Sequence, residues 1–207
     1  NVFLTSAFKD GFFEVQDAGS QKIGEFLDVK PGMRVVDACA GAGGKTLHLA
    51  ALMENKGQII AMDIHGWKLA ELKRRAKRAG AHNIETREIT DNKVIKRLHE
   101  KADRLLIDAP CSGLGVLKRN PDSKWKIDQD FIDRIRKEQE TILQDYSKII
   151  KKGGKMVYAT CSILPSENNE QVQNFLKNNS DFKLVKEEKV MPSTGFDGFY
   201  MALIERV

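Results

Sequence analysis

The sequence predicts an α/β fold in which a mainly parallel sheet is covered by helices on both faces. Between residues 34 and 178, short apolar runs alternate with longer segments of helical periodicity. Such alternation is typical of parallel strands joined by right-handed helical crossovers. The last 26 residues instead carry two strand-like segments in succession, which indicates an antiparallel pair. No internal repeat or low-complexity linker divides the chain, so we expect residues 1–207 to form one domain.

The elements of the first half follow from local patterns. Residues 1–17 are too irregular for a helix and are expected to form a short ribbon or loop that leads into the domain. Residues 18–28 carry Ile23, Phe26 and Leu27 at helical spacing and end before Pro31, so the lead-in segment and its helix occupy residues 1–30. Strands are then expected at Arg34–Ala38, Gln58–Met62, Ile84–Ile89 and Arg104–Ile107. Helices are expected between them at Thr46–Glu54, Gly66–Ala79 and Asn92–Glu100.

The second half begins with a long helical pattern. Apolar residues recur through residues 128–151, which predicts a helix over Asp128–Lys151 that is capped by Gly153-Gly154. The run Lys155–Ala159 is expected to be a strand and Ser166–Asn178 a helix. The chain then closes with two expected strands at Phe182–Val190 and Gly198–Glu205.

Composition sets bounds on function. Apolar residues make up 41% and charged residues 30% of the sequence, and no apolar run approaches the ~20 residues of a membrane helix. The odd number of three cysteines argues against a disulfide framework, so we expect a reducing, cytoplasmic setting. The formal net charge of +5 suits a polyanionic partner without requiring one. The four histidines show no ligand spacing with the cysteines, and we expect no metal.

A glycine-rich turn follows the first predicted strand. Glycines there let a ligand approach the backbone, and the helix that follows offers unpaired N–H groups. A phosphate-binding P-loop would need glycine at Cys39, and a nicotinamide fingerprint would need glycine at Thr46. The remaining reading is a loop that binds a nucleoside without a pyrophosphate, which fits S-adenosylmethionine. Its candidate contacts are Cys39, Ala40, Gly41, Ala42, Gly43, Gly44 and Lys45.

Two carboxylates follow later strands. Asp63 ends the second strand, where it could accept the ribose hydroxyls of a nucleoside, and its alternative role is to cap the helix from Gly66. Asp91 follows the third strand, where it could meet an adenine amino group or cap the next helix.

Two thiols and an acid occupy the ends of the fourth and fifth parallel strands. Asp108 and Cys111 lie in the motif DAPCSG, and Cys161 lies in TCS. Either cysteine alone could be a small buried residue. Together they suit methylation of cytosine at carbon 5, which needs a thiolate that adds to carbon 6 and an acid at the base's N3 edge. The target base must also leave its stack.

The motifs resemble those of the Nop/Sun (Fmu-like) family of S-adenosylmethionine-dependent RNA 5-methylcytosine methyltransferases, along essentially the whole chain. The resemblance rests on residues 39–46, 108–113 and 160–162, where glycine and alanine at 41 and 42 replace the family's alanine–proline pair. Further likenesses are VQD with SQ (residues 15–17 and 20–21), NPD with KW (120–122 and 124–125) and SENNE (166–170). The resemblance implies a class I methyltransferase fold with a seven-stranded sheet and an antiparallel C-terminal hairpin.

The resemblance also implies roles. Cys161 would be the attacking nucleophile, Cys111 would assist product release, and Asp108 would hold the target cytosine near the methyl donor. Lys45 would meet the methionine end of the cofactor, and Lys68 would lie near its ribose or adenine. The RNA would be ribosomal rather than transfer RNA, with transfer RNA as the alternative. Flanking RNA-binding domains would lie outside this chain, which begins at Asn1 without a methionine.

Two basic surfaces and two rival functions remain open. The charged helix at residues 68–78 is expected to be a solvated face, whereas Lys118, Arg119, Lys124, Trp125 and Lys126 are expected to contact RNA. One rival function is nucleotide hydrolysis through GGKT at residues 43–46. The other is a non-catalytic RNA-binding scaffold.

Overall fold

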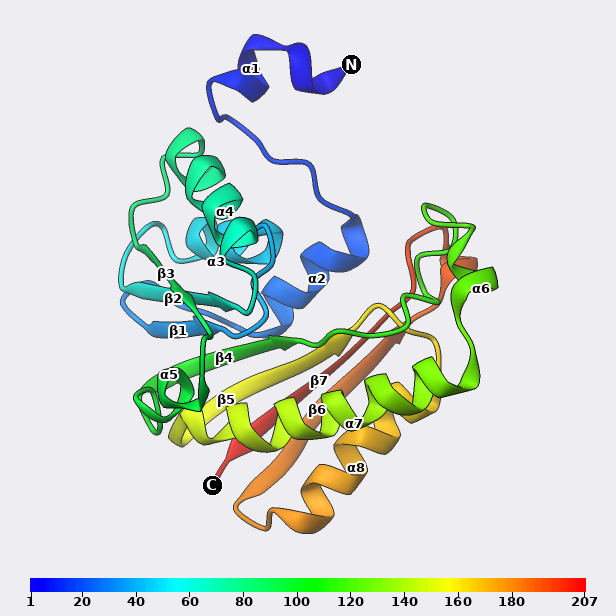
Figure 1. Cartoon of the computed structure of the whole chain (residues 1–207). Helices are drawn as coiled ribbons and strands as arrows, with labels where there is room; N and C mark the ends of the chain where they lie inside the picture. Colours follow the sequence, from blue (N-terminus) through cyan, green and yellow to red (C-terminus); the bar gives the residue numbers. More distant parts are fainter.

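A seven-stranded sheet forms the centre of the molecule (Figure 1). The structure, a computed structural model, describes residues 1–207 except for the side chain of Thr194. In spatial order the strands are β3 (Ile84–Glu88), β2 (Gln58–Asp63), β1 (Arg34–Asp37), β4 (Ala102–Asp108), β5 (Ile150–Thr160), β7 (Phe199–Arg206) and β6 (Phe182–Val190). The first five are parallel, and β7 runs antiparallel to both β5 and β6. The predicted fold, including the antiparallel pair, is confirmed.

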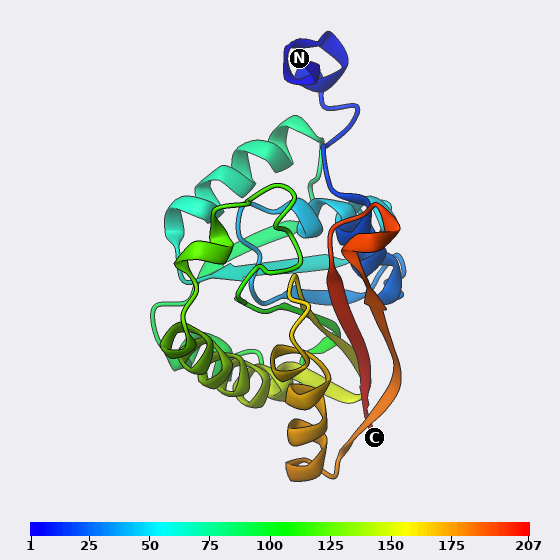
Figure 2. The same ribbon diagram turned by 90° about the vertical axis from the view of Figure 1, so that its right-hand side faces the viewer.

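Helices cover both faces of the sheet (Figures 1 and 2). On one face lie α2 (Ala18–Phe26), α3 (Gly44–Leu52) and α4 (Gly66–Arg78), and on the other α5 (Asn92–Lys96), α7 (Gln129–Tyr146) and α8 (Asn169–Asn178). Neighbouring residues of one strand serve opposite faces, because side chains alternate along a strand. Leu105 packs with the core under α7, for example, and Leu106 packs with the core under α2.

The expected helix over Asp128–Lys151 is wrong at its C-terminal end. Helix α7 stops at Tyr146, a 3-10 turn η2 covers Ser147–Ile149, and β5 already begins at Ile150. Ile149 and Ile150 fit the helical spacing, but the carbonyl of Ile149 accepts a hydrogen bond from Lys101 N, and Ile150 pairs with Ala102 of β4. The predicted cap Gly153-Gly154 therefore lies inside β5, where a Cβ on Gly154 would come within 3.1 Å of the Ala102 carbonyl.

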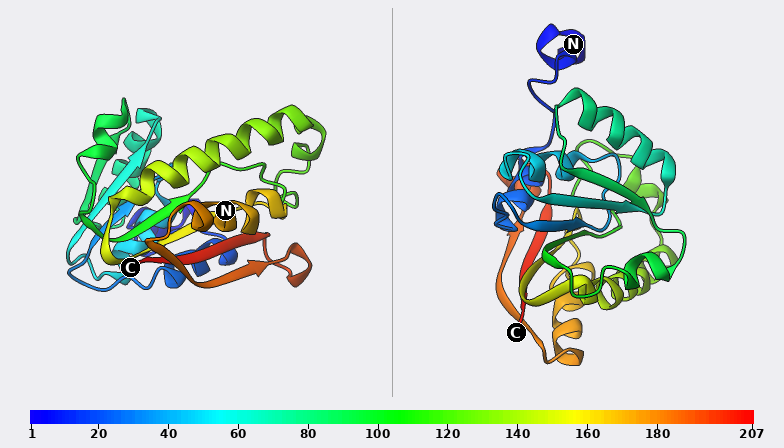
Figure 3. Two further views of the ribbon diagram at one scale, coloured as in Figure 1. Left: turned by 90° about the horizontal axis from the view of Figure 1, so that it is seen from below. Right: turned by 90° about the vertical axis from the view of Figure 1, so that its left-hand side faces the viewer.

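Two smaller expectations also differ from the structure. Residues 1–17 contain a 3-10 turn η1 (Val2–Leu4) and one helical turn α1 (Ser6–Lys9), which the side chains of Asn1 and Thr5 cap. This segment extends beyond the sheet over the end of α4 (Figure 2 and the right-hand view of Figure 3). The helix expected over Asn92–Glu100 ends at Lys96, and Glu100 has a left-handed φ of 57°.

The carboxyl ends of the parallel strands meet at one edge of the sheet. Asp37 ends β1, Asp63 ends β2, Asp108 ends β4 and Thr160 ends β5. In an open parallel sheet this edge is where ligands bind. None of the helices in the described part of the chain has both the length and the hydropathy needed to span a lipid bilayer.

Candidate active site

The two cysteine loops lie side by side because their strands are neighbours. Asp108 at the end of β4 pairs with Ala159 of β5. Beyond the strands, Ala109 N donates to the Ala159 carbonyl at 2.9 Å, and Gly115 N donates to the Cys161 carbonyl at 2.9 Å. These contacts bring the Sγ atoms of Cys111 and Cys161 to 3.1 Å from each other, in half-buried positions. Residues 50 positions apart thus form one pair of thiols.

A lysine–carboxylate pair lies beside the thiols. Lys45, in the first turn of α3, places its Nζ 2.6 Å from Oδ2 of Asp108. Burial alone would lower the pKa of Lys45, but the charge of Asp108 and its hydrogen bond raise the pKa above its ordinary value. Lys45 is therefore a fixed cation at this site. Its Nζ also lies 5.6 Å from the ring centre of Phe199.

The two thiols differ in their electrostatic surroundings. The hydrogen bond from Cys111 lowers the pKa of Cys161 below the ordinary thiol value, against the opposing effects of burial and of Asp108, and Lys45 lowers it further. The same hydrogen bond and burial raise the pKa of Cys111 well above that value, and Glu167 adds to the rise. Of the two thiols, Cys161 is therefore the one that loses its proton more readily.

A cavity of about 340 Å³ opens next to this cluster. Of the residues predicted to bind a cofactor, Cys39, Gly41, Asp63, Lys68 and Asp108 line it. Asp108 thus belongs both to the cavity wall and to the group of charged and thiol side chains. Burial raises the pKa of the Cys39 thiol well above its ordinary value, so Cys39 lines the cavity as an uncharged thiol.

The glycine-rich turn is tied to the neighbouring strand. Asp63 is buried, and its Oδ2 accepts a hydrogen bond from Gly41 N at 2.9 Å, while its Oδ1 accepts one from His65 N at 2.8 Å. Asp63 therefore fixes the backbone at the cavity rim. The N-cap residue of α4 is His65, not Asp63. Gly43 has a φ of 88°, and a Cβ there would lie 2.5 Å from Cγ of Leu72, so only glycine fits.

Other predicted contacts lie outside the cavity lining. Ala40, Ala42, Gly43 and Gly44 form the turn behind it, and Lys45 faces Asp108. Asp91 is exposed, and its Oδ1 accepts a hydrogen bond from Lys93 N at 2.7 Å. Asp91 therefore caps α5, which was the alternative reading of this residue.

Sequence reasoning missed the opposite wall of the cavity. Glu138, Ile142 and Tyr146 come from α7, at intervals of four residues that place them on one face of the helix. Ile64, His65, Ile89 and Pro110 complete the lining. Ile64 and Ile89 directly follow Asp63 and β3, so their places at the strand ends were a usable signal. Ile142 and Tyr146 belong to the apolar stripe of α7, and such a stripe looks the same in the sequence whether it packs in the core or lines a cavity.

The basic surfaces also differ from expectation. Arg75 of α4 donates to the Ala42 carbonyl at 2.8 Å and pairs with Glu14, which also pairs with Arg78. Arg75 thus holds the glycine-rich turn, and both arginines hold the N-terminal segment, so this part of α4 is not simply a solvated face. Beyond the DAPCSG motif, Arg119 pairs with the buried Asp197 at 2.5 Å. Trp125 in α6 (Ser123–Lys126) is 80% exposed, and Nζ of Lys124 lies 4.8 Å from the centre of its ring.

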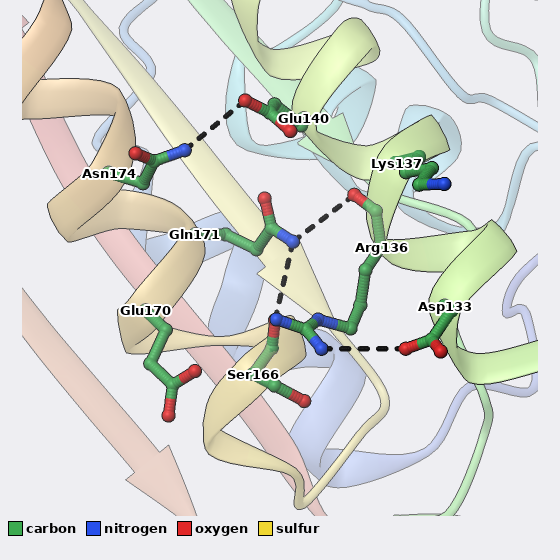
Figure 4. A pocket seen from close by; sticks show the side chains of 8 residues that line it. All are labelled: Asp133, Arg136, Lys137, Glu140, Ser166, Glu170, Gln171 and Asn174. Atoms are coloured by element: carbon green, nitrogen blue, oxygen red, sulfur yellow. Dashed lines mark hydrogen bonds and ion pairs between the residues drawn. The ribbon is translucent and has the colours of Figure 1, made fainter. Parts of the chain in front are cut away.

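A second cavity, of about 470 Å³, lies between α7 and α8 (Figure 4). Charged side chains line it, and Gln171 at its centre donates to the carbonyls of Arg136 and Ser166. Neither thiol lines this cavity. Within the described residues, no three His, Cys, Asp or Glu side chains are grouped so that they could hold a metal ion.

Comparison with known proteins places the chain in a family. The family model described as 16S rRNA methyltransferase RsmB/F matches residues 25–204. The chain belongs to the RsmB/F methyltransferase family. It is 40% identical over 178 residues to the probable ribosomal RNA small subunit methyltransferase B of Synechocystis sp.. The matched residues make up 85% of this chain and 40% of that protein. It is 35% identical to the methyltransferase B of Proteus mirabilis, over 100% of this chain and 49% of that protein.

Solved structures of the same fold agree. The crystal structure of PH0851 superposes with a TM-score of 0.96 at 34% identity, over 100% of this chain and 50% of that chain. NSun6 from Pyrococcus horikoshii with SFG superposes with a TM-score of 0.90 at 29% identity, over 100% and 56% of the two chains. The chain spans about half the length, or less, of the two ribosomal RNA methyltransferases described above. The fold is that of class I methyltransferases, as expected.

Proposed function

We propose that this domain transfers a methyl group from S-adenosylmethionine to carbon 5 of a cytosine in RNA, through a covalent bond between Cys161 and the base. The observation that carries the proposal is the pair of sulfurs 3.1 Å apart beside the ion pair of Lys45 and Asp108, at the rim of the 340 Å³ cavity. RNA is the proposed substrate because the relatives are named ribosomal RNA methyltransferases. Ribosomal RNA is therefore preferred over transfer RNA.

The cavity fits the proposed cofactor. Asp63 is buried at the rim with both oxygens oriented by backbone N–H groups, and each oxygen keeps a lone pair for a ribose hydroxyl. Ile64 and Ile89 provide the apolar walls that a purine needs, and Lys68 lies on the same wall. When bound, S-adenosylmethionine supplies an electrophilic methyl group. No phosphate-binding lysine projects from the turn, because Lys45 is held by Asp108, and this weighs against nucleotide hydrolysis.

Residues of this chain are available for the attack on the base, for holding its N3 edge and for release of the product. The Cys161 thiolate adds to carbon 6 of the cytosine, which makes carbon 5 nucleophilic enough to take the methyl group. Asp108 lies between the thiols and the cavity, where its carboxyl group can hold the N3 edge of the base and share a proton with it. Carbon 5 then loses its proton to a base, the bond from carbon 6 to sulfur breaks, and Cys161 leaves as the thiolate. Cys111 is placed to assist this release because its Sγ lies next to that of Cys161.

The experiment that tests this proposal separates the two thiols. The protein is incubated with 16S ribosomal RNA and labelled S-adenosylmethionine, and covalent complexes are separated on a denaturing gel. Cys111→Ala should accumulate a denaturation-resistant RNA–protein adduct, because attack proceeds while release is slowed. Cys161→Ala should form none, and Cys39→Ala, which keeps both thiols, should accumulate none either. Equal adduct formation by the Cys111 and Cys161 variants would contradict the assignment, and RNA binding without methyl transfer would favour the scaffold.

A further inference from the structure

A fully buried carboxylate lies directly behind the two thiols. Glu167 ends the 3-10 turn η3 (Pro165–Glu167), and its side chain is 0% exposed. Burying an ionised carboxylate is costly unless its oxygens are hydrogen-bonded. All of its side-chain partners are neutral: Oε1 accepts from Ser112 N at 2.8 Å and from Gln139 Nε2 at 3.0 Å, and Oε2 accepts from the hydroxyls of Ser112 at 2.5 Å and Ser162.

The two serines that Glu167 binds are the residues that follow the two cysteines. Ser112 follows Cys111 and Ser162 follows Cys161. Each hydroxyl accepts a hydrogen bond from the amide two residues farther along, from Leu114 at 3.4 Å and from Leu164 at 3.1 Å. Each hydroxyl donates to the same oxygen, Oε2 of Glu167. Oε2 of Glu167 therefore bridges the two loops one residue beyond each sulfur, in addition to the bond from Gly115 N to the Cys161 carbonyl and the 3.1 Å contact between the two serine hydroxyls.

The turn that carries Glu167 is itself fixed from several sides. Tyr158 of β5 donates its hydroxyl to the Glu167 carbonyl at 2.8 Å. Gln171 of α8 donates to the Ser166 carbonyl at 3.3 Å and to the Arg136 carbonyl of α7 at 3.2 Å, which ties the turn to both helices (Figure 4). Gln139 of α7, which binds the Glu167 carboxylate, also donates to the carbonyl of Pro110 at 2.9 Å. Pro110 is the residue before Cys111. The turn is thus anchored by residues of β5, α7 and α8 as well as by the two loops.

We propose that Glu167 is a positioning residue that holds the Cys111 and Cys161 sulfurs within hydrogen-bonding distance by binding the serine after each cysteine. This inference rests on the proposed function only for its catalytic consequence. If the two loops separate, Cys161 loses the hydrogen bond that lowers its pKa, and less of it is thiolate at neutral pH. Glu167 does not touch the reacting atoms, so its effect passes through the thiols.

The chemistry requires a carboxylate at this position. Two N–H groups and two O–H groups donate to Glu167, and an ionised carboxylate offers four acceptor positions. Glutamine has the same shape but only one acceptor oxygen, and its NH₂ group would face donors. Glu167→Gln should therefore loosen the two loops without creating a cavity. Glu170→Gln is the matched control, because it makes the same change three residues away on an exposed side chain.

The test is the pH dependence of Cys161 alkylation by iodoacetamide, followed by mass spectrometry of the Cys161 peptide. In the wild-type protein the rate should rise at a lower pH than for an ordinary thiol, and Glu170→Gln should keep this profile. In Glu167→Gln the midpoint should move up by about one pH unit, so that alkylation near neutral pH is about tenfold slower. A purely structural role would lower the melting temperature and leave the profile of the folded protein unchanged.

Single serine variants keep the inference testable if Glu167→Gln does not fold. Ser112→Ala and Ser162→Ala each remove one hydroxyl donor and leave Glu167 in place, and each should shift the midpoint in the same direction. The inference is overturned if folded Glu167→Gln, or both serine variants, alkylate with the wild-type profile. Alkylation needs neither RNA nor cofactor, whereas failure of the proposed function would appear as a wild-type protein that transfers no methyl group. The two failures are therefore distinguishable.

Discussion

Nζ of Lys45 lies 2.6 Å from Oδ2 of Asp108, and this ion pair joins the first turn of α3 to the end of β4. The pair links the two halves of the site, because Asp108 lines the cavity and Lys45 lowers the pKa of Cys161. The ammonium group of Lys45 therefore pairs with the Asp108 carboxylate and also lowers the pKa of Cys161.

Replacing Lys45 by methionine should weaken the nucleophile. Without the ammonium group, the pKa of Cys161 should rise, and Asp108 should lose its charged partner. We expect methyl transfer to fall by about tenfold or more near neutral pH, as is typical when a charged hydrogen bond is lost. The measurement is the pH–rate profile of single-turnover methyl transfer. Lys56→Met removes an exposed ion pair with Glu54 and serves as control; equal profiles for the two variants would contradict this role.

Substitutions at Asp63 and Asp91 should affect the affinity for S-adenosylmethionine differently. Asp63→Asn loses the charge at the cavity rim and turns an NH₂ group towards a backbone N–H, so we expect affinity for S-adenosylmethionine to fall by about tenfold or more. Asp91→Asn should keep the wild-type affinity, because asparagine caps a helix as well as aspartate does. Isothermal titration calorimetry of both variants decides the matter, and a comparable loss in Asp91→Asn would restore that residue to the cofactor site.

Arg75 should stabilise the cofactor turn from outside. It donates to the Ala42 carbonyl and pairs with Glu14, and its side chain is only 19% exposed. Arg75→Met should lower the free energy of unfolding by about 2 kcal/mol and also weaken S-adenosylmethionine binding, because the turn loses an anchor. Arg74→Met, on an exposed neighbour, is the control. Urea unfolding and calorimetry together test this; a loss of stability with unchanged affinity would limit Arg75 to the N-terminal segment.

Asp37 should make stability depend on pH. Its burial raises its pKa to about 7, against the hydrogen bond from Thr46, and Oδ1 is buried without a partner among the described residues. A carboxyl group whose pKa rises on folding stabilises the fold below its unfolded pKa, and this stability is lost as the pH rises through about 7.

The wild-type protein should therefore lose on the order of 3 kcal/mol between pH 5 and pH 8 relative to Asp37→Asn. Asparagine does not titrate, so the difference between the two urea-unfolding curves isolates this one group. A constant difference across that range would show that Asp37 keeps its ordinary pKa in the folded protein.

Local patterns determined most of the architecture. The short apolar runs of the five parallel strands and the helical periodicity between them are set by neighbours in sequence, so their places were predictable. The motifs with Asp108, Cys111 and Cys161 followed predicted strands, and parallel strands end at one edge of the sheet. The sequence therefore sufficed to place an acid and two thiols together.

The sequence-based predictions were wrong where contacts between distant segments override the helical spacing of apolar residues. Ile149 and Ile150 continue the apolar stripe of α7, yet the chain leaves the helix there because β4 offers hydrogen bonds to this segment. Asp91 suited adenine and a helix cap equally in the sequence, whereas in the structure it caps α5 and lies outside the lining of the 340 Å³ cavity.

What the sequence determined by itself is the order of strands and helices and the residue types at the strand ends, because periodicity and turn chemistry act over a few residues. Only the tertiary structure decided which thiol has its pKa lowered and which contacts hold the two thiols together. Cys161 owes its low pKa to Cys111 and Lys45, which lie 50 and 116 positions away, and Glu167 joins serines on two different loops. A buried polar group must find its partners in space, and no local pattern specifies where along the chain they are.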